Sequence, residues 1–180
     1  MNLEQTKNHS RYLSLLLRHK PEKENLNMDK YGYVSVNQIL SKLEISKDDL
    51  DYIVDNNDKK RFIYSDNKLL IRANQGHSIT VDLNLNSVIP PTVLYHGTSL
   101  KNKKNILKSG LLKGSRQHVH LSENIDTAKN VGLRYAKNED MLWIISIDTK
   151  KMYEDRYRFF KSENDVYLID HIPPMYLIIK

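Results

Sequence analysis

The sequence predicts an α+β protein built from two lobes, and three observations lead to that prediction. Apolar residues recur at helical spacing in the first part of the chain, whereas the second half is rich in short runs typical of strands. An extended, alternating segment over 79–91 ends in a double proline between these regions. With 180 residues, the chain is long enough to bury a core as one medium domain or as two small lobes. We therefore expect lobes over residues 1–87 and 88–180.

The first lobe is predicted to hold three helices and a hairpin. Tyrosine and leucine residues share one helical face near the N-terminus, which predicts a helix that ends near His19. Ser46 is a good N-cap for a later helix, because acidic residues follow it in the first turn. The other elements expected here are a turn at Asp29–Gly32 with a short strand after it, a helix over 36–44 and a β-hairpin over 61–73. Three helices followed by a hairpin is the pattern of a winged-helix module.

The second lobe is predicted to be rich in strands, with two helices. Gly110 stands where a helix C-cap is expected, and a proline break interrupts the last strands. The elements expected are a strand over 92–99, a helix over 100–110, a strand over 118–122, a helix over 124–137, a strand over 141–148 and hairpin strands over 158–180.

Composition and charge exclude several classes of protein. The chain has no cysteine, which excludes disulfides, thiolate nucleophiles and cysteine zinc sites. No apolar run approaches the roughly 20 residues that cross a bilayer, and the first residues lack the apolar stretch of a signal peptide. We therefore expect a cytoplasmic protein with no membrane partner. The net charge of +6 suits a polyanionic partner such as nucleic acid.

Two segments of the first lobe carry polar side chains suited to an anion. Arg18 and His19 end the first predicted helix, where a cation is also favourable because of the helix dipole. The segment “IRANQGHS”, residues 71–78, follows a short apolar run and has little bulk. Its candidate binding residues are Arg72, Asn74, Gln75 and His77.

Two segments of the second lobe lie on predicted strands. In “YHGTS”, Gly97 would let the backbone approach a ligand, while His96, Thr98 and Ser99 supply hydrogen bonds. In “SRQHVHLS”, the residues that alternate along the strand are Arg116, His118 and His120.

The motifs of several common enzymes are missing from the sequence. His118 and His120 would share one strand face, but carboxylates or cysteines at ligand spacing do not accompany them, so we expect no metal site. The sequence has no G-x-S-x-G elbow, no P-loop and no G-x-G-x-x-G. The remaining set of arginines and neutral hydrogen-bonding residues suits chemistry on phosphate, where positioning and neutralising charge matter most.

Six segments, taken in order, resemble the signature blocks of the RNA 2′-phosphotransferases, the tRNA 2′-phosphotransferase family. They are “SRYLSLLLRH”, “IRANQGHS”, “LYHGTS”, “RQHVHLS”, “VGLRYAK” and “NDVYLIDHIPPMYL”. The resemblance runs from about Ser10 to Leu177, nearly the whole chain. The chain departs from the family pattern at Asn164 and Asp165, where an Asn-Gly pair is usual, and at Tyr167, where the family has tryptophan.

The resemblance implies a fold and a reaction. The fold is an N-terminal winged-helix lobe followed by a C-terminal ADP-ribosyltransferase-like lobe that binds NAD. The reaction removes an internal RNA 2′-phosphate of the kind left at a tRNA splice junction. The 2′-phosphate attacks the nicotinamide riboside carbon of NAD and expels nicotinamide. The ribose 2″-hydroxyl then attacks that phosphate, which gives 2′-OH RNA and ADP-ribose 1″,2″-cyclic phosphate.

The resemblance also implies roles for individual residues. The catalytic Arg-His-Arg-Arg set falls on Arg18, His19, Arg72 and Arg134, with Arg116 as the competing candidate for the fourth position. The residues expected to line the NAD site are His96, Gly97, Thr98 and Ser122. The residues expected to fix the phosphate loop or meet the RNA are Asn74, Gln75, His77 and Arg116.

Two other functions compete with this one. The first is a non-catalytic winged-helix nucleic-acid binder with a degenerate second lobe. The second is an ADP-ribosyltransferase that acts on nucleic-acid phosphate ends or on protein and stops after the first step. A protein-modifying version would want a catalytic carboxylate beside the NAD ribose, and no Glu-x-Glu motif is present. We expect RNA as the partner. We also expect a monomer, because the sequence shows no long apolar surface helix or heptad that would pair with another protein chain.

Overall fold

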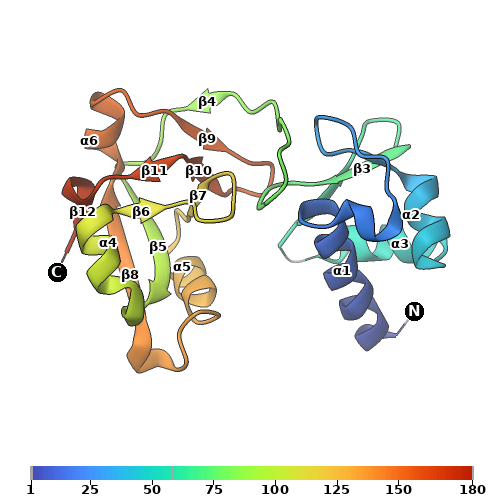
Figure 1. Ribbon diagram of the computed structural model, residues 1–180, viewed down its shortest axis with the longest axis horizontal. Helices are drawn as coiled ribbons and strands as arrows, with labels where there is room; N and C mark the ends of the chain where they lie inside the picture. Colours follow the sequence, from blue (N-terminus) through green and yellow to red (C-terminus); the bar gives the residue numbers. More distant parts are fainter. Residues whose placement is uncertain (1, 58, 180) are drawn as a thin grey trace. The chain divides into compact units, whose positions relative to one another are not determined.

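The computed structural model describes residues 2–57 and 59–179, and the chain divides into two compact units (Figure 1). Unit 1 spans Met1–Asn84 and unit 2 spans Leu85–Lys180. This division lies three residues before the boundary expected at residue 87. Both units mix helices and strands, as expected for an α+β protein. None of the described helices is long and apolar enough to cross a membrane.

Unit 1 combines helices with a small sheet, and the local sequence explains where its helices begin. Asn2 and Gln5 form a capping box at the start of the first helix, and Ser46 accepts the N–H of Asp49 as predicted. The elements are α1 (Leu3–Arg18), the 3-10 helix η1 (Pro21–Glu24), β1 (Val34–Ser35), α2 (Val36–Leu43), α3 (Lys47–Asp55), β2 (Phe62–Tyr64) and β3 (Leu70–Ala73). The helix ending near His19 and the hairpin over 61–73 are therefore confirmed.

The sheet of unit 1 places the segment 71–78 beside the turn at 29–33. Its strand order is β1-β3-β2, all antiparallel, with Ile71 opposite both Val34 and Tyr64. The predicted turn before β1 is present, since the N–H of Gly32 donates to the carbonyl oxygen of Asp29 at 3.0 Å. The core beneath the sheet is apolar and almost fully buried, and it includes Leu13, Leu16, Leu17, Ile39, Leu50, Ile53 and Ile71.

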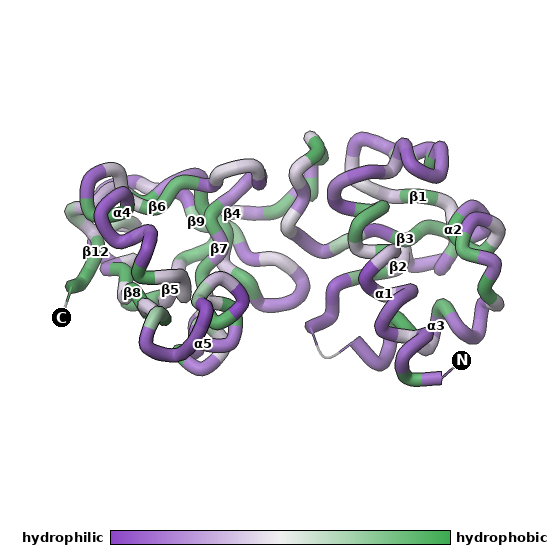
Figure 2. The backbone as a smooth tube through the Cα atoms, turned by 60° about the horizontal axis from the view of Figure 1, so that its bottom comes forward, coloured by the Kyte–Doolittle hydropathy of each residue, from purple (hydrophilic) through white to green (hydrophobic). Residues whose placement is uncertain are grey.

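Unit 2 is rich in strands, as the sequence predicts. Its strands are β4 (Ser87–Val88), β5 (Val93–Ser99), β6 (Leu111–Leu112), β7 (Val119–Leu121), β8 (Leu142–Asp148), β9 (Phe159–Lys161), β10 (Tyr167–Ile169), β11 (His171–Ile172) and β12 (Leu177–Ile178). Its helices are η2 (Leu100–Asn102), α4 (Lys103–Ser109), α5 (Ile125–Gly132), η3 (Glu139–Met141), α6 (Thr149–Glu154) and η4 (Pro174–Tyr176). The chain through β8 and β12 is largely hydrophobic (Figure 2).

Two sheets of unit 2 are joined at β5. One has the order β12-β8-β5 and the other β4-β9-β10-β7. Strand β5 pairs with β8 along its whole length, from Val93 opposite Asp148 to Ser99 opposite Leu142. Just after β7, Ser122 exchanges two backbone hydrogen bonds with Tyr95, at 2.9 and 2.8 Å. The middle of β5 is thereby fixed to both sheets.

Two sequence predictions for unit 2 differ from the structure. The helix expected over 124–137 ends at Gly132 as α5, and the following residues form turns closed on the carbonyl oxygens of Val131 and Gly132. A third helix, α6, was not expected. Asp148 caps it by accepting the N–H of Lys151, and Met152 is buried. Six residues are too few to show a helical period in the sequence.

The β9–β10 hairpin accommodates the departure from the family pattern. Asp165 has a φ of 59°, in the left-handed region where glycine is the usual residue. Its carboxylate lies 2.8 Å from the ammonium group of Lys161. The aspartate thus adopts the conformation that the family's glycine allows.

Candidate active site

The end of α1 and the segment 71–78 meet within unit 1. The N–H of Ser78 donates to the carbonyl oxygen of Arg18 at 3.0 Å, and His19 Nδ1 lies 2.9 Å from Ser78 Oγ. Arg18 is the last residue of α1 and His19 is its C-cap, where the helix dipole favours positive charge. The fold therefore brings together two of the polar segments that the sequence singled out, although His19 and Ser78 are 59 positions apart.

Arg72 belongs to unit 1, and its guanidinium group is only partly satisfied by the residues that the structure describes. It stands opposite Ile63 in the β2–β3 pair. Its Nη1 donates to the carbonyl oxygen of Tyr31 at 3.3 Å, and its guanidinium carbon lies 4.7 Å from the ring centroid of Tyr33. Its Nε is buried and has no hydrogen-bond partner among the described residues. A buried guanidinium donor without a protein acceptor is suited to an anionic ligand.

Asn74 and His77 are buried in unit 1, with exposed fractions of 5% and 1%. The N–H of Asn74 donates to the carbonyl oxygen of Arg61 at 2.9 Å, and its side-chain amide donates to that of Lys60 at 2.6 Å. The ring of His77 faces Gly32, since a Cβ added there would lie 3.6 Å from its Nε2. The sequence suggested two roles for these residues, support of the loop and contact with RNA. Their burial favours the first role.

In unit 2, His96, His120 and Arg116 form a connected cluster. His96 Nδ1 donates to the carbonyl oxygen of His120 at 2.9 Å, and Arg116 Nη1 donates to His120 Nδ1 at 3.4 Å. Because a carbonyl oxygen only accepts, Nδ1 of His96 carries a proton. Burial lowers the pKa of His96 below its usual value, and the hydrogen bond to His120 partly offsets this. The neutral ring then presents Nε2 as a hydrogen-bond acceptor.

Thr98 and Ser122, expected near NAD, flank this cluster. Thr98 is 6% exposed and its Oγ1 accepts from Asn102 Nδ2 at 3.1 Å, so its hydroxyl proton is not used by that bond. Ser122 is half-buried beside Tyr95, to which its backbone is bonded. The side chains of unit 2 therefore offer acceptors and hydroxyl donors of the type that a ribose and an amide require.

The fold explains why position 97 is a glycine, and the sequence alone could not show this explanation. A Cβ at this position would lie 1.8 Å from the carbonyl oxygen of Ala128 and 3.0 Å from the backbone nitrogen of Gly132, both in α5. A Cβ on Gly132 would in turn lie 3.0 Å from the Cα of Gly97. Helix α5 fills the Cβ side of Gly97, which is by itself a reason for glycine here. The expectation that the Gly97 backbone also lies near a ligand stays a prediction.

The two candidates for the fourth catalytic position lie in different surroundings. Arg134 is exposed in the turn after α5, where its N–H donates to the carbonyl oxygen of Val131 at 3.2 Å. Arg116 is half-buried and belongs to the His96 cluster through His120. His118 packs near Phe160, with ring centroids 6.2 Å apart, and burial lowers its pKa.

Some residues of these clusters were missed by the sequence reasoning. Three sets of contacts are involved. Ser78 hydrogen-bonds to His19 and Asn102 to Thr98. Arg72 donates to the Tyr31 carbonyl oxygen and lies over the ring of Tyr33. Ser78 belongs to the segment already singled out, so its hydroxyl was a usable signal. The tyrosines carried no such signal, because they are distant from Arg72 in the sequence; Tyr31, for example, is 41 positions away. In the described part of the chain, no three His, Cys, Asp or Glu side chains gather as a metal site would require.

Comparison with known proteins decides the family. Residues 4–171 match the RNA 2′-phosphotransferase, Tpt1 / KptA family. The chain belongs to this family. The resemblance read from the six sequence blocks is thereby confirmed, and the chain is an enzyme of the transferase class.

Relatives from several bacteria match the chain over nearly its whole length. A probable RNA 2′-phosphotransferase of Trichormus variabilis is 49% identical, and the match covers 93% of each chain. One of Fusobacterium nucleatum is 45% identical over 93% of this chain and 94% of the relative. One of Flavobacterium johnsoniae is 45% identical over 100% of both.

Proposed function

We propose that this enzyme removes an internal 2′-phosphate from RNA with NAD as a consumed co-substrate. The reaction passes through an RNA whose 2′-phosphate is ADP-ribosylated, and it yields 2′-OH RNA, nicotinamide and ADP-ribose 1″,2″-cyclic phosphate. One observation carries the proposal. Arg18, His19 and the segment 71–78 are held together in unit 1, and the buried Nε of Arg72 has no acceptor among the described residues. Membership of the RNA 2′-phosphotransferase family supports the substrate.

The residues of unit 1 suit a reaction in which the substrate itself is the nucleophile. An RNA 2′-phosphate has a second pKa of about 6, so it is largely a dianion at neutral pH. Arg18 and Arg72 would bind this phosphate and neutralise charge as it develops. His19, oriented by Ser78, would hydrogen-bond or transfer the proton of the attacking ribose hydroxyl in the second step. No cysteine or serine nucleophile is needed for this chemistry.

The residues of unit 2 fit NAD by the chemistry of their donors and acceptors. When bound, NAD supplies the ribose carbon that receives the phosphate and a neutral leaving group, nicotinamide. His96 Nε2 would accept a hydrogen bond from a ribose hydroxyl, because its Nδ1 is committed to the His120 carbonyl oxygen. Thr98, two residues after His96 on β5, and Ser122, just after β7, would supply hydroxyl groups. Gly97 would line the same site with its backbone, and its missing Cβ also leaves room for α5.

The fold of each unit supports the lobes that the family resemblance implies. Unit 1 runs helix, strand, helix, helix, strand, strand, apart from a short 3-10 helix, which is the order of a winged helix. Unit 2 would be the ADP-ribosyltransferase-like lobe. Under this proposal the enzyme is a cytoplasmic monomer that acts on tRNA splice-junction phosphates. Arg134 takes the fourth catalytic position, with Arg116 as the alternative.

One assay tests the proposal. An RNA with a single internal 2′-phosphate is incubated with the protein and NAD, and the fate of the phosphate and of nicotinamide is followed. Release of ADP-ribose cyclic phosphate, in step with nicotinamide, supports the proposal. Arrest at an ADP-ribosylated RNA would show an ADP-ribosyltransferase of nucleic-acid phosphates. Binding without release of nicotinamide would show a non-catalytic RNA binder.

The same assay, repeated with EDTA, tests the expected absence of a metal requirement. We expect turnover to persist, because guanidinium groups would take the charge-neutralising role that magnesium has in many phosphoryl transfers. Loss of turnover, restored by added magnesium, would overturn this expectation.

A further inference from the structure

The turn over residues 29–33 is fixed by a single aspartate. Oδ1 of Asp29 accepts the N–H of Tyr31 at 2.9 Å and the N–H of Tyr33 at 2.8 Å. The main chain of Asp29 closes the same turn, because its N–H donates to the carbonyl oxygen of Tyr33 at 2.9 Å and its carbonyl oxygen accepts from Gly32 at 3.0 Å. Four hydrogen bonds to one residue therefore define the path of this turn.

The turn presents two different groups to Arg72. The carbonyl oxygen of Tyr31 accepts from Arg72 Nη1 at 3.3 Å, and the guanidinium carbon lies over the ring of Tyr33, 4.7 Å from its centroid. One contact holds an edge of the planar guanidinium group and the other holds its face, so together they restrict its orientation more than either does alone. Both partners are uncharged groups, and they therefore orient the guanidinium without neutralising it.

The sheet of unit 1 brings the turn to Arg72. Strand β1 begins directly after the turn, and Val34 lies opposite Ile71 in the antiparallel β1–β3 pair. Continuing this register by one residue places Tyr33 opposite Arg72. Side chains of opposite residues in an antiparallel pair lie on one face of the sheet, which is why the ring and the guanidinium group can meet. The contact thus depends both on the register of the sheet and on the turn that Asp29 fixes.

We propose that the turn over 29–33 positions Arg72 for the transfer of the phosphate, with Asp29, Tyr31 and Tyr33 as its positioning residues. They hold the guanidinium group so that its buried Nε, which has no hydrogen-bond partner among the described residues, is left for a phosphate oxygen. An arginine held in advance needs little ordering when the ligand arrives, and a misplacement of about 1 Å can cost roughly 10²-fold in rate. The catalytic consequence rests on the proposed function, whereas the orientation of Arg72 rests on its contacts.

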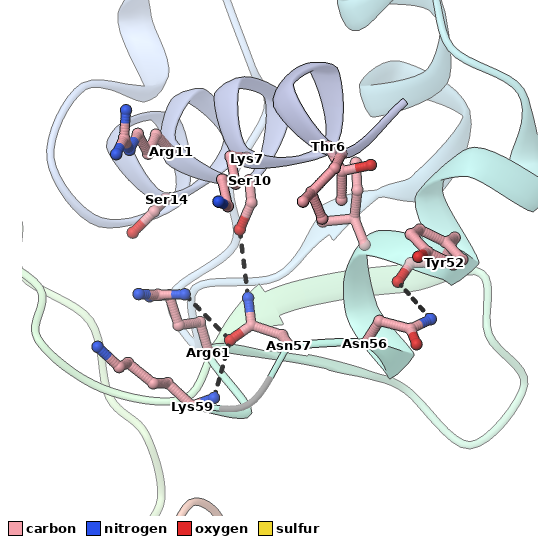
Figure 3. A pocket seen from close by; sticks show the side chains of 12 residues that line it. Thr6, Lys7, Ser10, Arg11, Ser14, Tyr52, Asn56, Asn57, Lys59 and Arg61 are labelled. Carbon is pink, nitrogen blue, oxygen red and sulfur yellow. Dashed lines mark hydrogen bonds between the residues drawn. The ribbon is translucent and has the colours of Figure 1, made fainter. Parts of the chain in front are cut away.

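Two substitutions of Tyr33 test the ring. Tyr33→Leu removes the aromatic face, and we expect kcat for an RNA with an internal 2′-phosphate to fall about tenfold, mainly without change in KM, while ADP-ribosylated RNA accumulates. Tyr33→Phe keeps the face and should restore kcat to within about threefold of the wild type. The matched control is Tyr52→Leu, since Tyr52 is an exposed residue of α3 that lines a separate pocket, whose described lining residues include neither Arg72 nor the turn (Figure 3). Wild-type kcat in Tyr33→Leu would overturn the inference.

Two substitutions of Asp29 test the turn independently of the ring. Asp29→Ala removes the acceptor of two backbone N–H groups, and we expect kcat to fall about tenfold. Asp29→Asn keeps an oxygen at the position of Oδ1, so kcat should return to within about threefold of the wild type. Equal kcat values in the two variants would contradict the role assigned to Asp29. Thermal unfolding of each variant, compared with Tyr52→Leu, shows that the fold is retained.

A double-variant cycle separates positioning of Arg72 from general support of the fold. If Tyr33 acts through Arg72, then Tyr33→Leu should change kcat by less than about twofold in a protein that already carries Arg72→Ala. A full tenfold loss in that background would show that Tyr33 acts independently of Arg72, and the proposal would be wrong.

A measurement without RNA separates failure of this inference from failure of the proposed function. The side-chain Nε–H resonance of Arg72 is followed by nuclear magnetic resonance and is assigned by its loss in Arg72→Ala. We expect a downfield shift of this proton in Tyr33→Leu, because shielding by the ring face is lost, and no shift in Tyr52→Leu. An unchanged resonance in Tyr33→Leu overturns the inference. A shifted resonance in a protein that releases no phosphate from RNA supports the positioning of Arg72 and overturns the proposed function.

Discussion

Unit 1 and unit 2 hold their candidate functional side chains in different ways. In unit 1, Arg18, His19 and most of the segment 71–78 lie at element ends or in irregular backbone, joined by single hydrogen bonds such as that from Ser78 to Arg18. In unit 2, His96 and Thr98 lie inside a strand that pairs with β8 over seven residues and contacts α5 through Gly97. We infer that unit 1 can adapt its charges to a moving phosphate, whereas unit 2 offers a preformed surface.

The largest expected effect is on catalysis, at Arg72. Arg72→Ala removes a guanidinium group from the proposed phosphate site, and loss of one such contact costs about 10²–10³ in rate. We expect the second step to fail, so that ADP-ribosylated RNA accumulates while nicotinamide is still released. Quenched-flow analysis of the RNA products measures this. A variant with wild-type turnover would show that Arg72 serves only the contacts with Tyr31 and Tyr33.

The next effect is on stability, at the contact between β5 and α5. Gly97→Ala places a methyl group 1.8 Å from the Ala128 carbonyl oxygen, and we expect a loss of about 3 kcal/mol in the free energy of unfolding. The matched control is Gly114→Ala, whose added Cβ would meet no described residue within 4 Å apart from its chain neighbours. Only its φ of +62° is unfavourable, at about 1 kcal/mol. Urea unfolding compares the two. Equal losses would contradict the close contact and leave proximity to a ligand as the reason for glycine at position 97.

A smaller effect is expected at Asn74, which separates support of the loop from RNA contact. Asn74→Ala removes the buried hydrogen bond to the Lys60 carbonyl oxygen, at a cost of about 1 kcal/mol in the free energy of unfolding. Affinity for RNA, measured well below the melting temperature, should change little. A large loss of affinity with unchanged stability would instead support direct contact with RNA.

The smallest effect concerns the pH dependence of stability. Burial lowers the pKa of His96 below the usual 6.5, so the folded chain takes up this proton less readily than the unfolded chain. The contribution of neutral His96 to the free energy of unfolding is therefore fully present above pH 6.5. It is lost as the pH falls from there towards the lower pKa of the folded state. His118 acts in the same direction. We expect the melting temperature of His96→Asn to fall less steeply with acid than that of the wild type; parallel curves would contradict this.

Much of the fold could be predicted because its signals are local. The helix that ends at His19 showed a complete apolar stripe, Ser46 stood ahead of acidic residues, and the hairpin over 61–73 carried two apolar runs around a turn. The end of α5 at Gly132 was missed, because “GLRYAK” continues with residues that tolerate a helix. The helix ends in a set of turns for which the sequence carries no recognisable signal.

The candidate site was predictable in its chemistry but not in its geometry. Arginine and histidine in short polar segments marked Arg18, His19 and Arg72, and the family resemblance joined them. The role of Gly97 could not be predicted, because its partner Ala128 is distant in sequence and contributes only a carbonyl oxygen.

The direct meeting of Gly97 with α5 has a mechanical consequence. Most helix–strand contacts are cushioned by side chains that can change rotamer, but here main-chain atoms touch on both sides. We therefore expect a displacement of the strand that bears His96 to move α5 with it, because no side chain lies between the two main chains at this point. The turn that carries Arg134 begins directly after Gly132, so we expect a ligand that displaces β5 to move Arg134 as well.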